Sequence, residues 1–158
     1  MDQRETMRLL SQVAEGDVSV ADAVQRLRQA PFEDLGFAKL DLHRGLRQGI
    51  PEVIFGSGKT PEQVQQITAA LLAAGQRTVL VTRFGAEAAI KLQASLGDGV
   101  EFQYFSQARI ALAGQIPEPD GIGRIVVATG GTSDQSVAEE AAITAQALGN
   151  EVVRLYDV

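Results

Sequence analysis

The sequence contains no cysteine, no tryptophan and only one histidine among its 158 residues. Without cysteine the chain forms no disulfide, and it offers neither a thiolate ligand for zinc nor a cysteine nucleophile. The single histidine, His43, cannot assemble a multi-histidine metal centre. We therefore predict no metal site, although carboxylates could still hold magnesium as a cofactor. Chemistry within this chain has to come from hydroxyl, carboxylate and cationic groups.

Long apolar runs and an excess of basic residues are also missing. The formal net charge is -6, with 14 lysine and arginine residues against 20 acidic ones. Nucleic-acid-binding domains usually carry a basic excess, so we expect no nucleic acid as partner. No stretch reaches membrane-spanning length, and the N-terminal sequence MDQRETMRLL lacks the basic and apolar regions of a signal peptide. We expect a soluble, cytoplasmic protein with no membrane contact.

The pattern of apolar residues predicts an α/β protein. Helical spacing on both sides of Gly16-Asp17 indicates a helical hairpin within residues 1–30. Beyond it, strands and helices alternate, which favours a parallel α/β sheet. The predicted strands cover residues 37–42, 51–55, 77–83 and 100–105, and the predicted helices cover residues 60–74 and 85–96.

A proline- and glycine-dense segment at residues 117–123 predicts a linker. We assign residues 1–116 to a small N-terminal α/β domain and residues 124–158 to a second, incomplete domain. The second part reads as strand, helix and strand, at residues 125–128, 136–148 and 151–156. One such unit cannot cover both faces of a parallel sheet, so it would need more chain or a partner.

The turn from Thr129 to Asp134 is the strongest candidate for a ligand site. It follows an apolar strand and precedes a helix, where an α/β sheet binds anions with free backbone N–H groups. The alternative is that Ser133 or Asp134 only caps the helix. The spacing of a Rossmann fingerprint is absent, and Asp157 is too generic to restore it. The predicted substrate-binding residues are Gly130, Gly131, Thr132, Ser133 and Asp134, and the predicted catalytic residues are Ser133 and Asp134.

Two further segments carry charge or glycine. The segment from Gly56 to Thr60 fails as a P-loop because the first required glycine is replaced by Val53. The basic turn at residues 43–49 contributes Arg44 and Arg47 as predicted substrate-binding residues, because guanidinium groups suit phosphate and carboxylate geometry. The alternative for this turn is a solvated basic segment neutralised by nearby carboxylates, which is the favoured interpretation of its histidine.

Two groups of residues resemble a known family. The first comprises Phe32-Glu33-Asp34-Leu35-Gly36, Ala38-Lys39-Leu40-Asp41, His43-Arg44, Leu46-Arg47, Pro51-Glu52-Val53-Ile54-Phe55-Gly56 and Gly58-Lys59-Thr60. The second comprises Leu80-Val81-Thr82-Arg83, Thr129 to Asp134, Ala138-Glu139-Glu140-Ala141 and Arg154-Leu155-Tyr156-Asp157-Val158. Together they closely resemble the N-terminal portion of the LarB family, which begins nickel-pincer cofactor synthesis. The block after residue 123 is also similar to the start of the aminoimidazole ribonucleotide carboxylase PurE, with Gly131 in place of a serine.

This resemblance implies the start of a PurE/flavodoxin-like parallel sheet and a carboxylase that also hydrolyses a phosphoanhydride. Nicotinic acid adenine dinucleotide and carbon dioxide, or bicarbonate, would give pyridinium-3,5-biscarboxylic acid mononucleotide and AMP. In the family a cysteine thiolate is thought to add to the pyridinium ring, and full-length members assemble as octamers. That cysteine lies in the family beyond the part resembled here, so we expect part of the substrate cradle without the nucleophile. Two alternatives stay open, namely a regulatory or assembly module with a vestigial nucleotide-binding turn and a generic NAD-binding domain.

Overall fold

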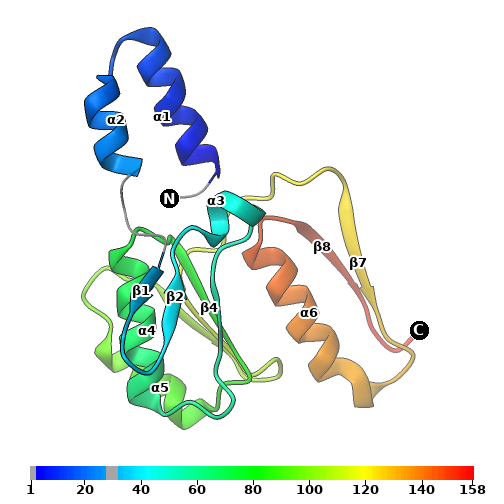
Figure 1. Ribbon diagram of the computed structural model, residues 1–158. Helices are drawn as coiled ribbons and strands as arrows, with labels where there is room; N and C mark the ends of the chain where they lie inside the picture. Colours follow the sequence, from blue (N-terminus) through cyan, green and yellow to red (C-terminus); the bar gives the residue numbers. More distant parts are fainter. Residues whose placement is uncertain (1–2, 28–31) are drawn as a thin grey trace.

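The computed structural model describes residues 3–27 and 32–158 as an α/β structure (Figure 1). The predicted hairpin is present as α1 (Gln3–Glu15) and α2 (Val20–Leu27), while the parts of that prediction at residues 1–2 and 28–30 lie outside the described residues. The other helical segments are α3 (Arg44–Gln48), α4 (Pro61–Ala73), α5 (Ala86–Ser95), η1 (Thr132–Asp134) and α6 (Gln135–Ala147). The strands are β1 (Phe32–Asp34), β2 (Lys39–Asp41), β3 (Val53–Phe55), β4 (Thr78–Thr82), β5 (Phe102–Phe105), β6 (Ile110–Gly114), β7 (Arg124–Ala128) and β8 (Glu151–Leu155).

The central sheet has four strands in the order β3-β4-β6-β5. Strands β3 and β4 are parallel, as expected for a strand-helix-strand unit. However, β6 is antiparallel to both of its neighbours, so the expected parallel pairing holds for β3 and β4 but not for β6. The physical reason is the short turn between β5 and β6, which can only join antiparallel strands. The sheet is therefore mixed.

Both faces of the central sheet are covered by helices. Val79 and Val81 point to the face that packs against α4 and α5, and Leu80 points to the opposite face. That opposite face is covered by α6 from the end of the chain, through Ile143 and Ala147. Figure 1 shows α6 between the central sheet and the β7–β8 pair.

Strands β7 and β8 form a separate two-stranded parallel sheet in register from Arg124 opposite Glu151 to Ala128 opposite Leu155. This confirms the expected first β-α-β unit of a parallel sheet. The β7 strand is largely exposed, and Val126 retains 56% of its accessible surface. The apolar side chains of β7 therefore remain largely in contact with solvent. Strands of parallel sheets are usually buried on both faces, so this small sheet is only partly covered.

Two helix ends show why the sequence forms these helices. Thr60 accepts a hydrogen bond from the Gln63 N–H and donates its own N–H to the Gln63 side chain, which is the predicted capping box of α4. At the end of α6, Gly149 adopts a positive φ of 81°, and the Asn150 N–H bonds back to the Ala145 carbonyl. This Schellman arrangement ends the helix at the predicted glycine.

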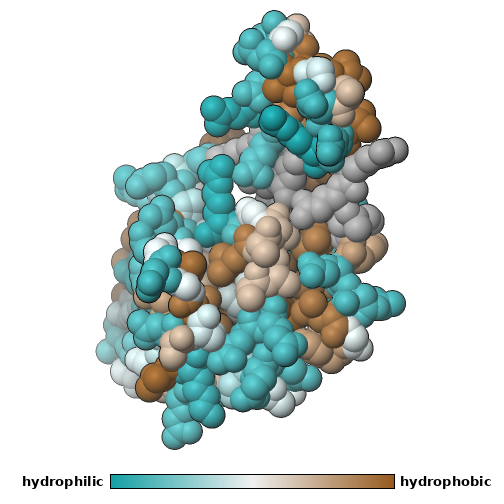
Figure 2. Space-filling view, turned by 90° about the vertical axis from the view of Figure 1, so that its left-hand side faces the viewer, coloured by the Kyte–Doolittle hydropathy of each residue, from teal (hydrophilic) through white to brown (hydrophobic). Residues whose placement is uncertain are grey.

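The helical hairpin stands apart from the sheet at the top of Figure 1 and presents apolar side chains to the surface, several of which are visible in Figure 2. Its exposed apolar residues are Met7, Leu10, Val20 and Val24. Elsewhere, the face in Figure 2 is mixed, with apolar groups in its middle and towards its right-hand side among hydrophilic ones. Within residues 3–27 and 32–158, no helix combines the length and apolar character needed to cross a bilayer.

Candidate functional site

The 129–134 loop, from Thr129 to Asp134, leaves the carboxyl end of β7 and is held at its first residue. Thr129 is buried, its N–H donates to the Leu155 carbonyl at 3.0 Å, and its carbonyl accepts the Val158 N–H at 3.1 Å. The Asp157 N–H also lies 3.4 Å from the Thr129 hydroxyl. These bonds join the loop to the chain that follows β8, so the loop begins from a fixed point.

The polar side chains of the loop are free to meet a ligand. Thr132, Ser133 and Asp134 form the short helix η1, and all three are exposed. Asp134 occupies the position before α6, yet its side chain makes no capping hydrogen bond. Within the described parts of the chain, none of the three side chains has a hydrogen-bond partner. The alternative of a purely capping role therefore has no bond to support it in this structure.

The two glycines of the loop are not required by the fold itself. Gly131 has an extended backbone with φ of 179°, and a Cβ placed there would meet nothing within 4 Å. A Cβ at Gly130 would make only an ordinary contact of 3.8 Å with the Val158 carbonyl. Neither left-handed geometry nor crowding explains these glycines. The space they leave open lies beside the free side chains, where a ligand could approach the backbone.

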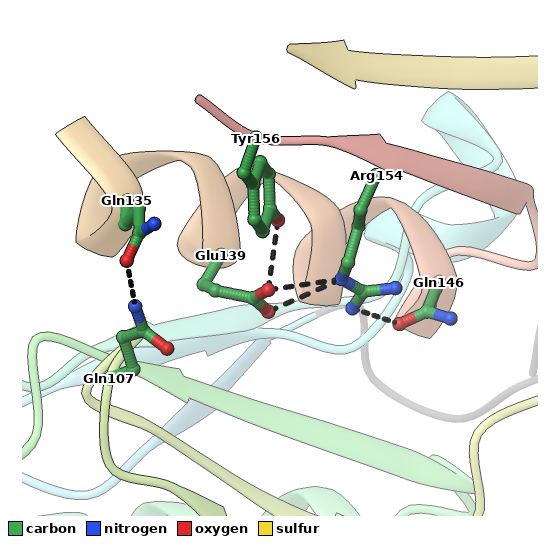
Figure 3. A network of polar contacts seen from close by, with 6 residues as sticks. All are labelled: Gln107, Gln135, Glu139, Gln146, Arg154 and Tyr156. Carbon is green, nitrogen blue, oxygen red and sulfur yellow. Dashed lines mark hydrogen bonds and ion pairs between the residues drawn. The ribbon is translucent and has the colours of Figure 1, made fainter. Parts of the chain in front are cut away.

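A polar network ties α6 to β8 next to this loop (Figure 3). Glu139 accepts hydrogen bonds from Arg154 Nε at 3.1 Å and from the Tyr156 hydroxyl at 2.8 Å, and Arg154 also donates to Gln146. Burial raises the pKa of the Tyr156 hydroxyl, and the carboxylate of Glu139 raises it further. Glu139, Arg154 and Tyr156 entered the sequence analysis only through the family resemblance, because their contact depends on how α6 packs on β8.

Arg44 and Arg47, predicted as substrate-binding residues, lie elsewhere. Both are on α3, which precedes β3 and lies near the amino ends of the parallel strands, whereas the 129–134 loop follows a strand end (Figure 1). Arg44 Nη1 lies 3.6 Å from Glu52 Oε1, and Arg47 forms an ion pair with Asp41. The structure does not bring these two arginines to the loop, and their role in substrate binding stays a prediction.

The ion pairs around α3 are partly buried. Arg47 also lies over the Phe32 ring, 5.9 Å from its centroid. Burial raises the pKa of Glu52, and Arg44 opposes part of that rise. Of the described side chains, Arg44 Nε and Asp41 Oδ1 are buried atoms without a hydrogen-bond partner. His43, the histidine of the predicted basic turn, precedes α3, and its side chain makes no capping hydrogen bond.

Two other arginines, Arg83 and Arg109, lie at the end of the central sheet where β4 ends and β6 begins; Arg83 entered the sequence analysis only through the family resemblance, and Arg109 was not singled out. Arg83 directly follows β4 and forms an ion pair of 3.0 Å with Glu140 near the start of α6. Arg109 directly precedes β6, whose beginning lies beside the end of β4. Because β6 was not predicted, only the position of Arg83 after a strand was visible in the sequence. The antiparallel pairing that brings them together was not.

An open groove of about 460 Å³ runs along α6 beside β7. Its walls are mainly apolar, with Arg83 and Glu140 among the polar lining residues. The apolar lining includes Ile125, Val137, Ala141 and Leu148. In the described residues, no three histidine or acidic side chains lie close enough together to hold a metal ion.

The structure is an α/β protein in which an exposed polar loop joins the end of β7 to the start of α6. Comparison with known proteins narrows the class: the family described as "LarB/PurE-like N-terminal domain" matches residues 32–115, more than half of the chain. The chain therefore belongs to the LarB family, as the resemblance predicted. It is also similar to the uncharacterized protein MJ0165 of Methanocaldococcus jannaschii, with 28% identity over 162 residues. That match covers 95% of this chain but only 60% of the relative's length.

Proposed function

We propose that this chain supplies part of the substrate cradle for a LarB-type carboxylation of nicotinic acid adenine dinucleotide. Family membership supports a LarB-type, carboxylase-like role. The observation that carries the finer proposal is the 129–134 loop, where three exposed polar side chains have no bond to the rest of the described chain. Such groups at a strand end and helix start are suited to ribose hydroxyls and phosphate oxygens.

In the proposed reaction, the pyridinium ring loses a C–H proton and gains a carboxylate from carbon dioxide or bicarbonate. Water then cleaves the phosphoanhydride, which releases AMP and leaves pyridinium-3,5-biscarboxylic acid mononucleotide. Ser133 and Thr132 would donate or accept hydrogen bonds to the substrate, and the Asp134 carboxylate would accept a ribose hydroxyl or the ring proton. Because the sequence has no cysteine, this proposal assigns to the chain substrate binding, positioning and acceptance of the ring proton, and no thiolate step.

Calorimetric titration of the 158-residue chain tests this proposal. Nicotinic acid adenine dinucleotide, NAD and ATP are added in turn to the parent and to a Ser133→Ala, Asp134→Ala double variant. We expect the parent to prefer the first ligand and the variant to lose at least about tenfold in affinity, because two polar contacts are removed. A Ser11→Ala, Asp98→Ala variant makes the same chemical changes at exposed positions far from the loop. Equal binding by all three proteins would refute the cradle.

The same titration separates the alternatives. A generic NAD-binding domain would bind NAD at least as well as the nicotinic acid dinucleotide. A regulatory or assembly module with a vestigial turn would bind neither dinucleotide.

A further inference from the structure

A dinucleotide at the 129–134 loop raises an electrostatic difficulty. The two phosphates of the ligand carry negative charge, the chain has a net charge of -6, and Asp134 lies in the loop itself. A nearby cation would offset this repulsion and bind phosphate oxygens directly. Arg44 and Arg47 do not serve, because they lie near the amino ends of the parallel strands and pair with Glu52 and Asp41.

Arg109 is the cation whose position fits. It ends the turn between β5 and β6, and its own carbonyl accepts the Phe84 N–H at 2.8 Å. Its neighbours in sequence, Ala108 and Ile110, are both buried, whereas Arg109 itself is exposed. The turn is therefore anchored on each side of Arg109, and its side chain is left on the solvent side.

The turn is also connected to the loop. The Gln107 side chain donates to the Gln135 side chain at 3.1 Å, two residues before Arg109 and one residue after Asp134 (Figure 3). This bond places the β5–β6 turn next to the beginning of α6. The turn that carries Arg109 therefore lies beside Gln135, the residue that directly follows the 129–134 loop.

Arg109 differs from Arg83 in what its charge already contacts. Arg83 is paired with Glu140. By contrast, the Arg109 guanidinium has no ion-pair or hydrogen-bond partner among the described residues. Both arginines have the same left-handed φ of 53°, so the unpaired charge of Arg109, and not its backbone, distinguishes it from Arg83. An exposed arginine with an unpaired charge at the end of a fixed turn is available to bind an anion.

We propose that Arg109, from the N-terminal α/β unit, binds the phosphate groups of the dinucleotide held at the 129–134 loop. This inference rests on the proposed function and adds to it a specificity-determining residue from the other part of the chain. It explains why the β5–β6 turn and the start of α6 are joined. The ligand class it selects is a diphosphate-bearing nucleotide over a nucleoside without phosphate.

The test compares parent, Arg109→Gln and Arg109→Lys chains by calorimetry, with Arg26→Gln as a control that removes the same charge from the helical hairpin. The probes are nicotinic acid adenine dinucleotide, nicotinic acid riboside and inorganic pyrophosphate. We expect Arg109→Gln to weaken dinucleotide and pyrophosphate binding about tenfold or more and to leave riboside binding unchanged. Arg109→Lys should retain part of the affinity, and Arg26→Gln all of it. Thermal unfolding of each variant verifies that it is folded.

The possible failures are distinguishable. If Arg109→Gln binds the dinucleotide as tightly as the parent, the role of Arg109 is wrong and the proposed function stands. If pyrophosphate binds in an Arg109-dependent way but the dinucleotide does not bind, Arg109 is a phosphate site and the proposed function is wrong. If the parent binds none of the probes, both proposals are overturned.

Discussion

Arg154 Nε lies 3.1 Å from Glu139 Oε1 across the interface between β8 and α6. The same carboxylate accepts a hydrogen bond from the Tyr156 hydroxyl. One glutamate thus binds a donor within β8 and another directly after it. Glu139→Ala should therefore lower the free energy of unfolding by about 1–3 kcal/mol, since it leaves two partly buried donors without an acceptor. Chemical denaturation measures this, with the exposed Glu118→Ala as the matched control. A change no larger than that of the control would show that the network contributes nothing to stability.

The raised pKa of Tyr156 has a defined effect at alkaline pH. Burial and Glu139 disfavour the phenolate, so the folded protein holds this proton more tightly than the unfolded chain does. The resulting stability is complete below the unfolded pKa of about 10 and is lost as the pH rises through the folded pKa. Ultraviolet titration of a Tyr104→Phe variant, which leaves Tyr156 as the remaining tyrosine, should give a midpoint above the ordinary value. Adding Glu139→Gln should move that midpoint down, and no movement would contradict the assigned cause.

Arg44 should matter more at neutral than at acidic pH. Burial raises the pKa of Glu52 and Arg44 opposes that rise, so removing Arg44 raises this pKa further. Arg44→Met should destabilise the fold by about 1–2 kcal/mol near pH 7, where Glu52 is left ionised without its partner. A group with a raised folded pKa stabilises below its unfolded pKa, and that contribution is lost as the pH rises. The penalty should therefore shrink towards about pH 4.5. Denaturation at both pH values measures it, and the effect of Arg44→Met in a Glu52→Gln background should show no such pH dependence.

Replacing Gly114 or Gly131 by alanine should have very different effects on the stability of the protein. Gly114 has a φ of 99°, and a Cβ there would lie 1.9 Å from the Arg77 carbonyl oxygen. Gly114→Ala should cost more than about 2 kcal/mol, because both strain and overlap oppose it. Gly131→Ala should change stability by less than about 0.5 kcal/mol, since the space around it is open. If Gly131→Ala keeps its stability but binds the dinucleotide more weakly, the glycine serves the ligand. Thermal melting and calorimetry together decide this.

The cap of α4 offers a simple test of local stability. Thr60→Ala removes the side-chain oxygen that accepts the Gln63 N–H and should destabilise the protein by about 1 kcal/mol. Thr60→Ser keeps the hydroxyl and should stay within a few tenths of the parent. Urea denaturation of the three proteins provides the comparison. Equal losses for alanine and serine would indicate that the methyl group, and not the cap, is responsible.

Local sequence signals predicted the helices well because their causes are local. Thr60, Pro61 and Gln63 specify the start of α4, and Gly149 specifies the end of α6. The strand β6 was missed because Ala111 and Ala113 are poor strand formers, and only burial between two neighbours makes this run a strand. The segment at residues 43–49 was predicted as a turn but contains the short helix α3.

The candidate site also combines a part that local sequence predicts with a part that depends on contacts between distant segments. The 129–134 loop is one continuous segment, so its composition and its place after a strand were readable. Whether Arg44 or Arg109 shares an end of the sheet with it depends on strand order and direction, which no short-range pattern contains. The contact between Gln107 and Gln135 spans 28 residues and follows only from the packing of α6 on the central sheet.

Helix α6 connects β7 to β8 in the chain, yet it also covers one face of the central sheet with Ile143 and Ala147. Separating the β7–α6–β8 unit from the central sheet would expose Leu80 and Leu112 to water, together with the apolar face of α6. The two units are thus coupled thermodynamically: heating should melt them in one cooperative transition, with the calorimetric enthalpy equal to the van't Hoff enthalpy. A chain cut at the segment 117–123 would instead release a half with a bare apolar sheet face, and that half would be prone to aggregate.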